Sequence, residues 1–299
     1  MKDQDLRDYI MIIGVFDLIS RKIRENISKA ASEGIPVAVG VLTDDFVKDY
    51  LLTVPLKSTE ERMDVASGIE GVSFVFPAKS NILEENKKIA DDYYKEYMAN
   101  IKENLEVSET KKYKVGIVIG SFDLYHSGHH QNLELSHKLC DHLYVLLKSS
   151  ARILEKKGVM PQQNDEIRSE VLRSLRVVDG VIPYDIDSTR ELAIQDVIKK
   201  HQQLFHENLS RSDIVAIFGD DLREKETERW NNGDWCGINV AFTPREKEKM
   251  RPSYLGGRGV SSSSYRAKLK AEGEEKRTSA QEAYLSHRQI ENEGLISDL

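Results

Sequence analysis

An apolar run that ends in glycine and leads into a helix constrains the fold of this chain most. Residues 115–119 read Val-Gly-Ile-Val-Ile, and Gly120 follows them. Such a run is typical of a buried parallel strand. A polar loop comes next, and the spacing of the leucines in residues 133–139 predicts a helix from about His129 onwards. We therefore predict a strand–loop–helix unit of an α/β fold, with a ligand site at the carboxyl edge of its sheet.

The chain contains a second version of this pattern. Gly14-Val-Phe-Asp-Leu18 resembles Gly120-Ser-Phe-Asp-Leu124, at an offset of 106 residues from position 14 to position 120. The same offset pairs Asn26 with Asn132, Pro55 with Pro161, Arg62 with Arg168 and Pro77 with Pro183. A constant register over this length indicates a duplicated unit. Each copy predicts a second strand (36–42 and 143–147), a loop that ends in proline, a helix, and a third strand (72–76 and 178–182).

Only the second copy continues beyond its third strand. There we expect a helix over 188–204 and strands over 213–219 and 237–242, whereas residues 83–105 predict one long helix or a helix pair between the copies. The predicted fold is a doubly wound parallel α/β sheet of the Rossmann type, preceded by a partial, degenerate copy of the same unit. The expected division is a degenerate half-repeat over 1–78, a helical linker over 79–112, a complete domain over 113–271 and a helical or disordered tail over 272–299.

Composition narrows the class of protein. The formal net charge of −7 argues against a nucleic-acid binder that relies on neutralising phosphates. Two cysteines, Cys140 and Cys236, form neither a disulfide framework nor a zinc spacing, which favours a reducing compartment. The apolar run of residues 9–16 is too short to span a bilayer. We therefore expect a cytoplasmic protein without a membrane span.

Two histidines mark the start of the helix in the second copy. His126 and His129 flank Gly128, and the first copy has Ser20-Arg-Lys-Ile23 at this place. A helix start offers unpaired N–H groups that attract phosphate, and glycine lets the backbone approach a ligand closely. Five of the eight histidines lie between residues 126 and 142, but their spacing fits no structural zinc pattern. The residues thus predict phosphate chemistry in the second copy alone.

The string from Gly120 to His129 resembles the nucleotide-binding signature of the cytidylyltransferase family, whose members act on glycerol-3-phosphate, choline phosphate and ethanolamine phosphate. The resemblance extends from residue 114 to about 270. Residues 173–182 are similar to the family's Arg-Tyr-Val-Asp-x-Val segment, and Phe218-Gly-Asp-Asp221 is similar to its Gly-Asp-Asp strand end. The family also keeps an arginine next to Gly-Ile-Ser-Thr. About a dozen residues separate Arg245 from Gly259-Val-Ser-Ser-Ser263 here, so Arg245 or Arg258 takes that role.

The resemblance implies a role for each site residue. His126 and His129 would contact the α- and β-phosphates, Lys156 and Lys157 would reach the attacking or leaving phosphate, and Arg168 would clamp the substrate phosphate. Asp123 either holds the loop or takes part in catalysis. A Mg²⁺ ion would bridge the triphosphate, with no side chain assigned as its ligand. The implied nucleotide-binding residues are Gly120, Ser121, Phe122, Asp123, Gly128, Gly219, Asp220, Asp221, Arg245, Arg258, Val260, Ser261, Ser262 and Ser263.

The resemblance predicts a cytidylyltransferase that transfers CMP from CTP to a small phosphorylated alcohol or sugar-like acceptor. The product would be a CDP-activated precursor for lipid or surface polysaccharide synthesis. Residues 156–164 also resemble the adenylyltransferase half of heptose-phosphate enzymes, so ATP is an alternative. A third reading is an inert regulatory or scaffold protein. We expect a monomer in which the two copies pair internally, or a weak homodimer, and no motif identifies the acceptor.

Overall fold

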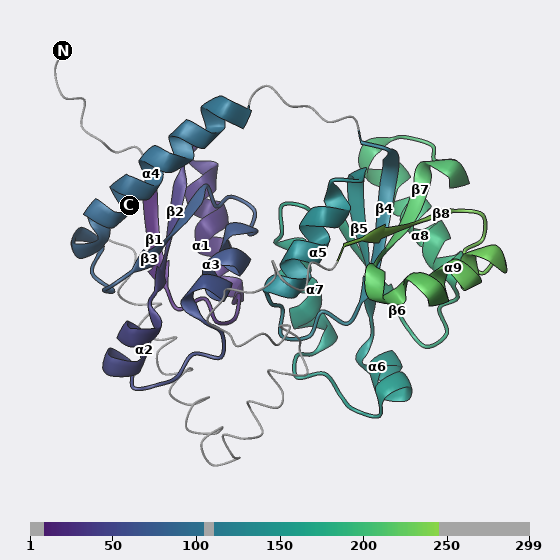
Figure 1. Cartoon of the computed structure of the whole chain (residues 1–299), viewed down its shortest axis with the longest axis horizontal. Helices are drawn as coiled ribbons and strands as arrows, with labels where there is room; N and C mark the ends of the chain where they lie inside the picture. Colours follow the sequence, from purple (N-terminus) through teal and green to yellow (C-terminus); the bar gives the residue numbers. More distant parts are fainter. Residues whose placement is uncertain (1–8, 105–110, 245–299) are drawn as a thin grey trace. The chain divides into compact units, whose positions relative to one another are not determined.

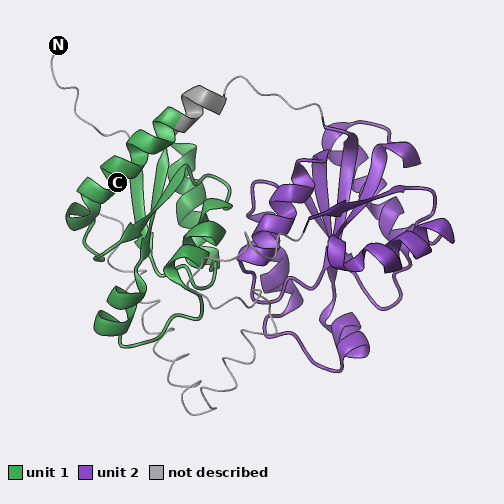
Figure 2. Ribbon diagram, in the orientation of Figure 1, with its two compact units in different colours: residues 1–108, 262–299 green, residues 109–261 purple. Residues whose placement is uncertain are grey.

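The computed structural model describes residues 9–104 and 111–244 (Figure 1). They form two compact units, each with a parallel sheet of its own (Figure 2). Residues 9–104 belong to the first unit and residues 111–244 to the second.

The first unit is built on a three-stranded parallel sheet in the order β1-β2-β3. Its strands are β1 (Ile10–Gly14), β2 (Val37–Leu42) and β3 (Phe74–Ala78). Its helices are α1 (Arg21–Ser32), α2 (Asp44–Tyr50), α3 (Thr59–Ser67) and α4 (Leu83–Asn104). All six residues of β2 are buried, as expected of the central strand of a parallel sheet.

The long helix predicted between the copies is a single helix, α4, and it packs on the first sheet. Ala90 is fully buried in the same apolar cluster as Phe74. The Tyr9 hydroxyl donates to Asp91 at 2.6 Å, and the Tyr94 ring lies 5.3 Å from the Tyr9 ring and 5.7 Å from Phe74. These aromatic contacts make α4 part of the core of the first unit.

The second unit has a five-stranded parallel sheet in the order β6-β5-β4-β7-β8. Its strands are β4 (Tyr113–Gly120), β5 (Cys140–Lys148), β6 (Gly180–Tyr184), β7 (Ile214–Gly219) and β8 (Asn239–Thr243). Its helices are α5 (Ser127–His137), α6 (Ser150–Lys157), α7 (Asp165–Arg173), α8 (Arg190–Phe205) and α9 (Arg223–Asn231), with short 3₁₀ turns η1 (Arg211–Asp213) and η2 (Asp220–Leu222). The strand order reverses between β4 and β7, which is where doubly wound folds bind ligands. The predicted fold class is confirmed.

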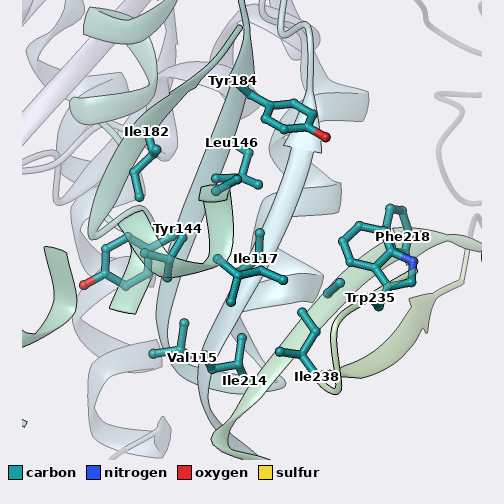
Figure 3. Close-up of a cluster of buried hydrophobic side chains, with 14 residues drawn as sticks. Val115, Ile117, Tyr144, Leu146, Ile182, Tyr184, Ile214, Phe218, Trp235 and Ile238 are labelled. Atoms are coloured by element: carbon teal, nitrogen blue, oxygen red, sulfur yellow. The ribbon is translucent and has the colours of Figure 1, made fainter. Parts of the chain in front are cut away.

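One face of the second sheet carries a continuous apolar core (Figure 3). Tyr144, Leu146 and Ile117 contribute to it from the central strands, and Trp235 packs beside Phe218 with ring centroids 5.1 Å apart. The Trp235 indole is 2% exposed and donates to Glu226 at 3.2 Å, so its polar atom is satisfied. This core holds the five strands of the second sheet in place.

Three helices differ from the sequence expectation. The sequence predicts loops after β2 and β5, but these segments contain α2 and α6, and the sequence does not predict α9. Thr43 and Ser149 cap α2 and α6, since their hydroxyls accept the backbone N–H of Phe46 and Arg152. These helices are short, and in α6 and α9 only Ile153 and Glu226 are buried, so no apolar period revealed them.

Candidate functional site

The two predicted imidazoles stack at the start of α5. His126 is the N-cap residue, with φ −141° and ψ 171°, and its carbonyl accepts the N–H of His129 and of His130. Its imidazole does not cap the helix and instead stacks on the His129 ring, with centroids 3.8 Å apart. His126 is 4% exposed. Two neighbouring imidazoles at a helix N-terminus offer donors and a favourable dipole to an anion.

The loop before the helix has a strained, closely packed backbone. Phe122 and Leu124 have left-handed φ values of 48° and 49°. A Cβ at Gly120 would lie 2.5 Å from the Phe122 ring, so only glycine fits there. The Phe122 ring lies 5.0 Å from the ring of His129. The Gly-Ser-Phe-Asp loop therefore positions the Phe122 ring against the His129 imidazole.

The side chain of Asp123 has the contacts of a residue that holds this loop. It is 2% exposed, and its two carboxylate oxygens accept the backbone N–H of Gln162 and of Gln163, each at 3.0 Å. The Gln163 side chain in turn accepts the Leu124 N–H at 3.1 Å. These bonds fasten the loop after β4 to the segment before α7.

Arg168, expected to clamp the substrate phosphate, is fully buried. Its Nε donates to the Gln163 carbonyl at 3.1 Å, and Nη1 donates to the carbonyls of Ser121 and Lys148 at 2.5 and 2.9 Å. Its Nη2 donates to the Asp165 carboxylate at 2.8 Å and contacts the Ser150 hydroxyl at 3.4 Å. All five N–H donors of the guanidinium are thus used inside the protein. Arg168 joins the loops of the site and has no donor left for a ligand.

The first unit repeats these contacts at the same offset of 106. Asp17 accepts the N–H of Leu56 and of Lys57 at 2.5 and 2.9 Å. Arg62 is also fully buried and donates to the carbonyls of Val15 and Lys57 and to Asp44. This unit has no imidazole at the helix start, where the Ser20 hydroxyl caps α1. Because the first unit has this aspartate and arginine but not the two histidines, we assign a structural role to Asp123 and Arg168.

The lysines at and after the end of β5 differ in exposure: Lys156 and Lys157 are exposed, and Lys148 is partly buried. Lys156 and Lys157 occupy the last turn of α6, and Lys156 lies 3.6 Å from Glu155. Lys148, which the sequence analysis did not select, is the final residue of β5. Burial lowers the pKa of Lys148, and the charges of Lys157 and Arg152 lower it further. A lysine that ends an apolar strand beside the glycine loop is the sequence signal that could have identified it.

The strand ends on the other side of β4 carry the predicted Gly219, Asp220 and Asp221. Asp220 pairs with Arg223 at the start of α9. At the end of β8 the Thr243 hydroxyl contacts the Asn132 side chain at 3.1 Å, which links α5 to this side of the sheet. The sequence patterns do not mark Asn132 and Thr243 as site residues.

Several predicted residues lie outside the described part of the chain, namely Arg245, Arg258, Val260, Ser261, Ser262 and Ser263.

The histidines, cysteines and carboxylates of the described part form no preassembled metal site. In residues 9–104 and 111–244 no three His, Cys, Asp or Glu side chains are grouped so that they could hold a metal ion. His142 is partly covered: its Nδ1 lies 3.1 Å from Asp179 and its ring lies 3.8 Å from the Phe205 ring. None of the helices in the described part is long and apolar enough to cross a membrane.

Comparison with known proteins identifies related sequences for the second unit. A family model described as cytidylyltransferase-like matches residues 117–268. The bifunctional protein HldE of Hyphomonas neptunium is 34% identical over 113 residues, which cover 36% of this chain and 23% of that protein. HldE of Rhodopseudomonas palustris strain TIE-1 is 30% identical over 170 residues, or 53% of this chain and 34% of that protein. The matches thus span only about a quarter to a third of the length of these relatives.

Among solved structures, the lipopolysaccharide core biosynthesis protein from Thermoplasma volcanium aligns with a TM-score of 0.32 and 24% identity. The alignment covers 44% of this chain and 94% of that one.

Proposed function

Because this chain belongs to the cytidylyltransferase-like family, we propose that its second unit transfers a nucleotidyl group from a nucleoside triphosphate to a small phosphorylated acceptor. The observation that carries the proposal is the stacked pair His126 and His129 at the N-terminus of α5. It lies at the carboxyl edge of the sheet, beside the reversal of strand order between β4 and β7.

The proposed reaction needs no protein nucleophile. A phosphate oxygen of the acceptor forms a bond to the α-phosphorus, the bond from that phosphorus to the bridging oxygen breaks, and pyrophosphate leaves with the electron pair. An acceptor phosphate that is already a dianion gives up no proton. The protein positions the two reactants and stabilises the charge that spreads over the phosphate oxygens. His126 and His129 would donate to the α- and β-phosphates, and Lys157 would act as a point charge.

A divalent cation would enter this site bound to the nucleotide. The described residues offer no ready group of three ligands, and Mg²⁺ commonly takes its ligands from substrate phosphates and water. The carboxylate of Asp123 is already occupied by two backbone N–H groups. We therefore propose that triphosphate oxygens hold Mg²⁺, which would neutralise part of the charge on the leaving pyrophosphate.

CTP is the first candidate for the nucleotide, and ATP is the second. The family description supports CTP. The similarity to HldE proteins and the Lys157-Gly158 sequence after β5 support ATP. The side chains that would contact the base include residues beyond 244, so the choice rests on experiment.

The test measures pyrophosphate release from CTP and from ATP, with Mg²⁺, against a panel of phosphorylated acceptors. The panel should include glycerol, choline and ethanolamine phosphates and several sugar 1-phosphates. Release that depends on both a nucleotide and an acceptor supports the proposal. If the protein binds neither CTP nor ATP in calorimetric titration, the enzyme proposal fails and the alternative of an inert regulatory protein gains support.

A further inference from the structure

Lys148 lies at the carboxyl edge of the second sheet, next to the loop that leads to the histidines. The ladder between β4 and β5 pairs Gly120 with Leu147, so Ser121 and Lys148 are neighbours just beyond this pair. One nitrogen of Arg168 donates to the carbonyls of both, at 2.5 and 2.9 Å. The backbone of Lys148 is therefore fixed beside the candidate site by a fully buried guanidinium.

The side chain of Lys148 shares its sheet face with Leu146 and, in register on β6, with Tyr184. Arg152 stacks on the Tyr184 ring, with its guanidinium carbon 3.9 Å from the ring centroid. The positive charges of Lys157, Arg152 and Lys225 all act on the Lys148 ammonium. Lys148 at the end of β5 is thus under the influence of three other cations, two on α6 and one on α9.

The carboxylates near this group are already engaged. Asp185 interacts with Arg152 and accepts from the Ser149 hydroxyl at 2.6 Å. The charge of Glu226 acts favourably on Lys148. Its two oxygens already accept from Arg229 at 2.6 Å and from the Trp235 indole at 3.2 Å. Within the described residues, the Lys148 ammonium makes no hydrogen bond and no ion pair. A partly buried positive charge among other cations is unfavourable, and a bound anion would offset that cost.

We propose that Lys148, together with Lys157, binds the attacking phosphate of the acceptor. This inference rests on the function proposed above and assigns a residue to the acceptor side of the same site. An ammonium donates charge-assisted hydrogen bonds to phosphate oxygens, and a phosphate dianion would neutralise two of the clustered cations. Arg168 donates to the Lys148 carbonyl at 2.9 Å and so holds the backbone of this residue in place.

The experiment uses inorganic phosphate as the probe for the acceptor side. A non-hydrolysable α,β-methylene analogue of CTP or ATP, whichever the protein binds, first saturates the triphosphate side. Phosphate is then titrated calorimetrically into the full chain, into the Lys148→Met and Lys148→Arg variants, and into Lys199→Met. Lys199 is an exposed lysine of α8, so its variant is the matched control for the loss of one surface charge.

We expect Lys148→Met to weaken phosphate binding about tenfold or more, since a hydrogen bond to a charged group is lost. Binding of the nucleotide analogue should stay within about twofold, Lys148→Arg should recover part of the phosphate affinity, and Lys199→Met should match the unmodified protein. Thermal unfolding should show that Lys148→Met remains folded, because methionine buries the same stem without a charge.

Each other result contradicts the inference in a distinct way. Unchanged phosphate affinity in Lys148→Met, or analogue binding without any phosphate binding, overturns the assignment and leaves the proposed function standing. An equal loss of phosphate and analogue affinity places Lys148 on the triphosphate instead. Absence of analogue binding by the unmodified chain overturns both proposals.

Discussion

At the scale of single residues, the stacked imidazoles are the groups on which activity should depend most. We predict that His126→Ala or His129→Ala lowers turnover about a hundredfold or more, the effect of removing one preorganised donor to developing charge. His206→Asn is the control, because His206 is exposed and has a left-handed φ of 57°, which asparagine tolerates. Steady-state pyrophosphate release measures the change. Turnover within a few-fold of the unmodified enzyme would exclude the assigned site.

Substitutions of the buried arginines Arg168 and Arg62 distinguish a structural role from a role in ligand binding. Arg168→Lys removes several of the hydrogen bonds that join the loops, so we predict a loss of about 3 kcal/mol in the free energy of unfolding of the second unit. Arg62→Lys should destabilise the first unit similarly, since Arg62 also donates to two loop carbonyls and to a carboxylate. Urea unfolding of both variants measures this. A raised KM for the acceptor with unchanged stability of Arg168→Lys would instead restore its role as a phosphate clamp.

At the scale of elements, α5 carries a buried histidine that should make stability depend on pH. Burial, followed by the charge of Arg176, lowers the pKa of His130 to about 4, whereas the unfolded value is about 6.5. Glu134 is the nearest carboxylate, 3.8 Å from Nε2. A lowered pKa means that the unfolded state takes up the proton first, so stability is full above pH 6.5 and falls between pH 6.5 and 4. His130→Gln should flatten this decline in urea unfolding at stepped pH; an unchanged slope would contradict the prediction.

The same scale shows which elements the sequence could predict. The parallel strands and α5 follow from long apolar runs, glycine and a clear turn, all of which are local signals. Helices α2, α6 and α9 have only seven, eight and nine residues, too few for an apolar period to stand out in the sequence. Side-chain caps at Thr43 and Ser149 begin α2 and α6, whereas α9 has no side-chain cap. The position of Arg168 in a motif indicated its importance but not the direction of its side chain. Only the contacts with Ser121, Lys148 and Gln163 reveal that it points into the protein.

At the scale of the whole molecule, two units share one framework, but only the second carries the imidazoles. The offset of 106 relates their aspartates, arginines and left-handed phenylalanines, Phe16 and Phe122. This recurrence supports the hypothesis that the chain arose by duplication of one unit. Whether the units pair internally stays a prediction, for which sedimentation velocity of the full chain provides the measurement.

The first unit should neither bind nor turn over nucleotides. In place of His126 it has Ser20, whose hydroxyl is taken by the N–H of Ile23, and it has no counterpart of Gly128. Lys57 fills the position of Gln163, and its buried ammonium donates to the Asp17 carbonyl. Because α4 completes the core of this unit, residues 1–112 should fold as a fragment. Calorimetric titration of that fragment with CTP and ATP should give no measurable heat, while the full chain binds one of them. Tight binding by the folded fragment would show that phosphate recognition does not require the histidine pair.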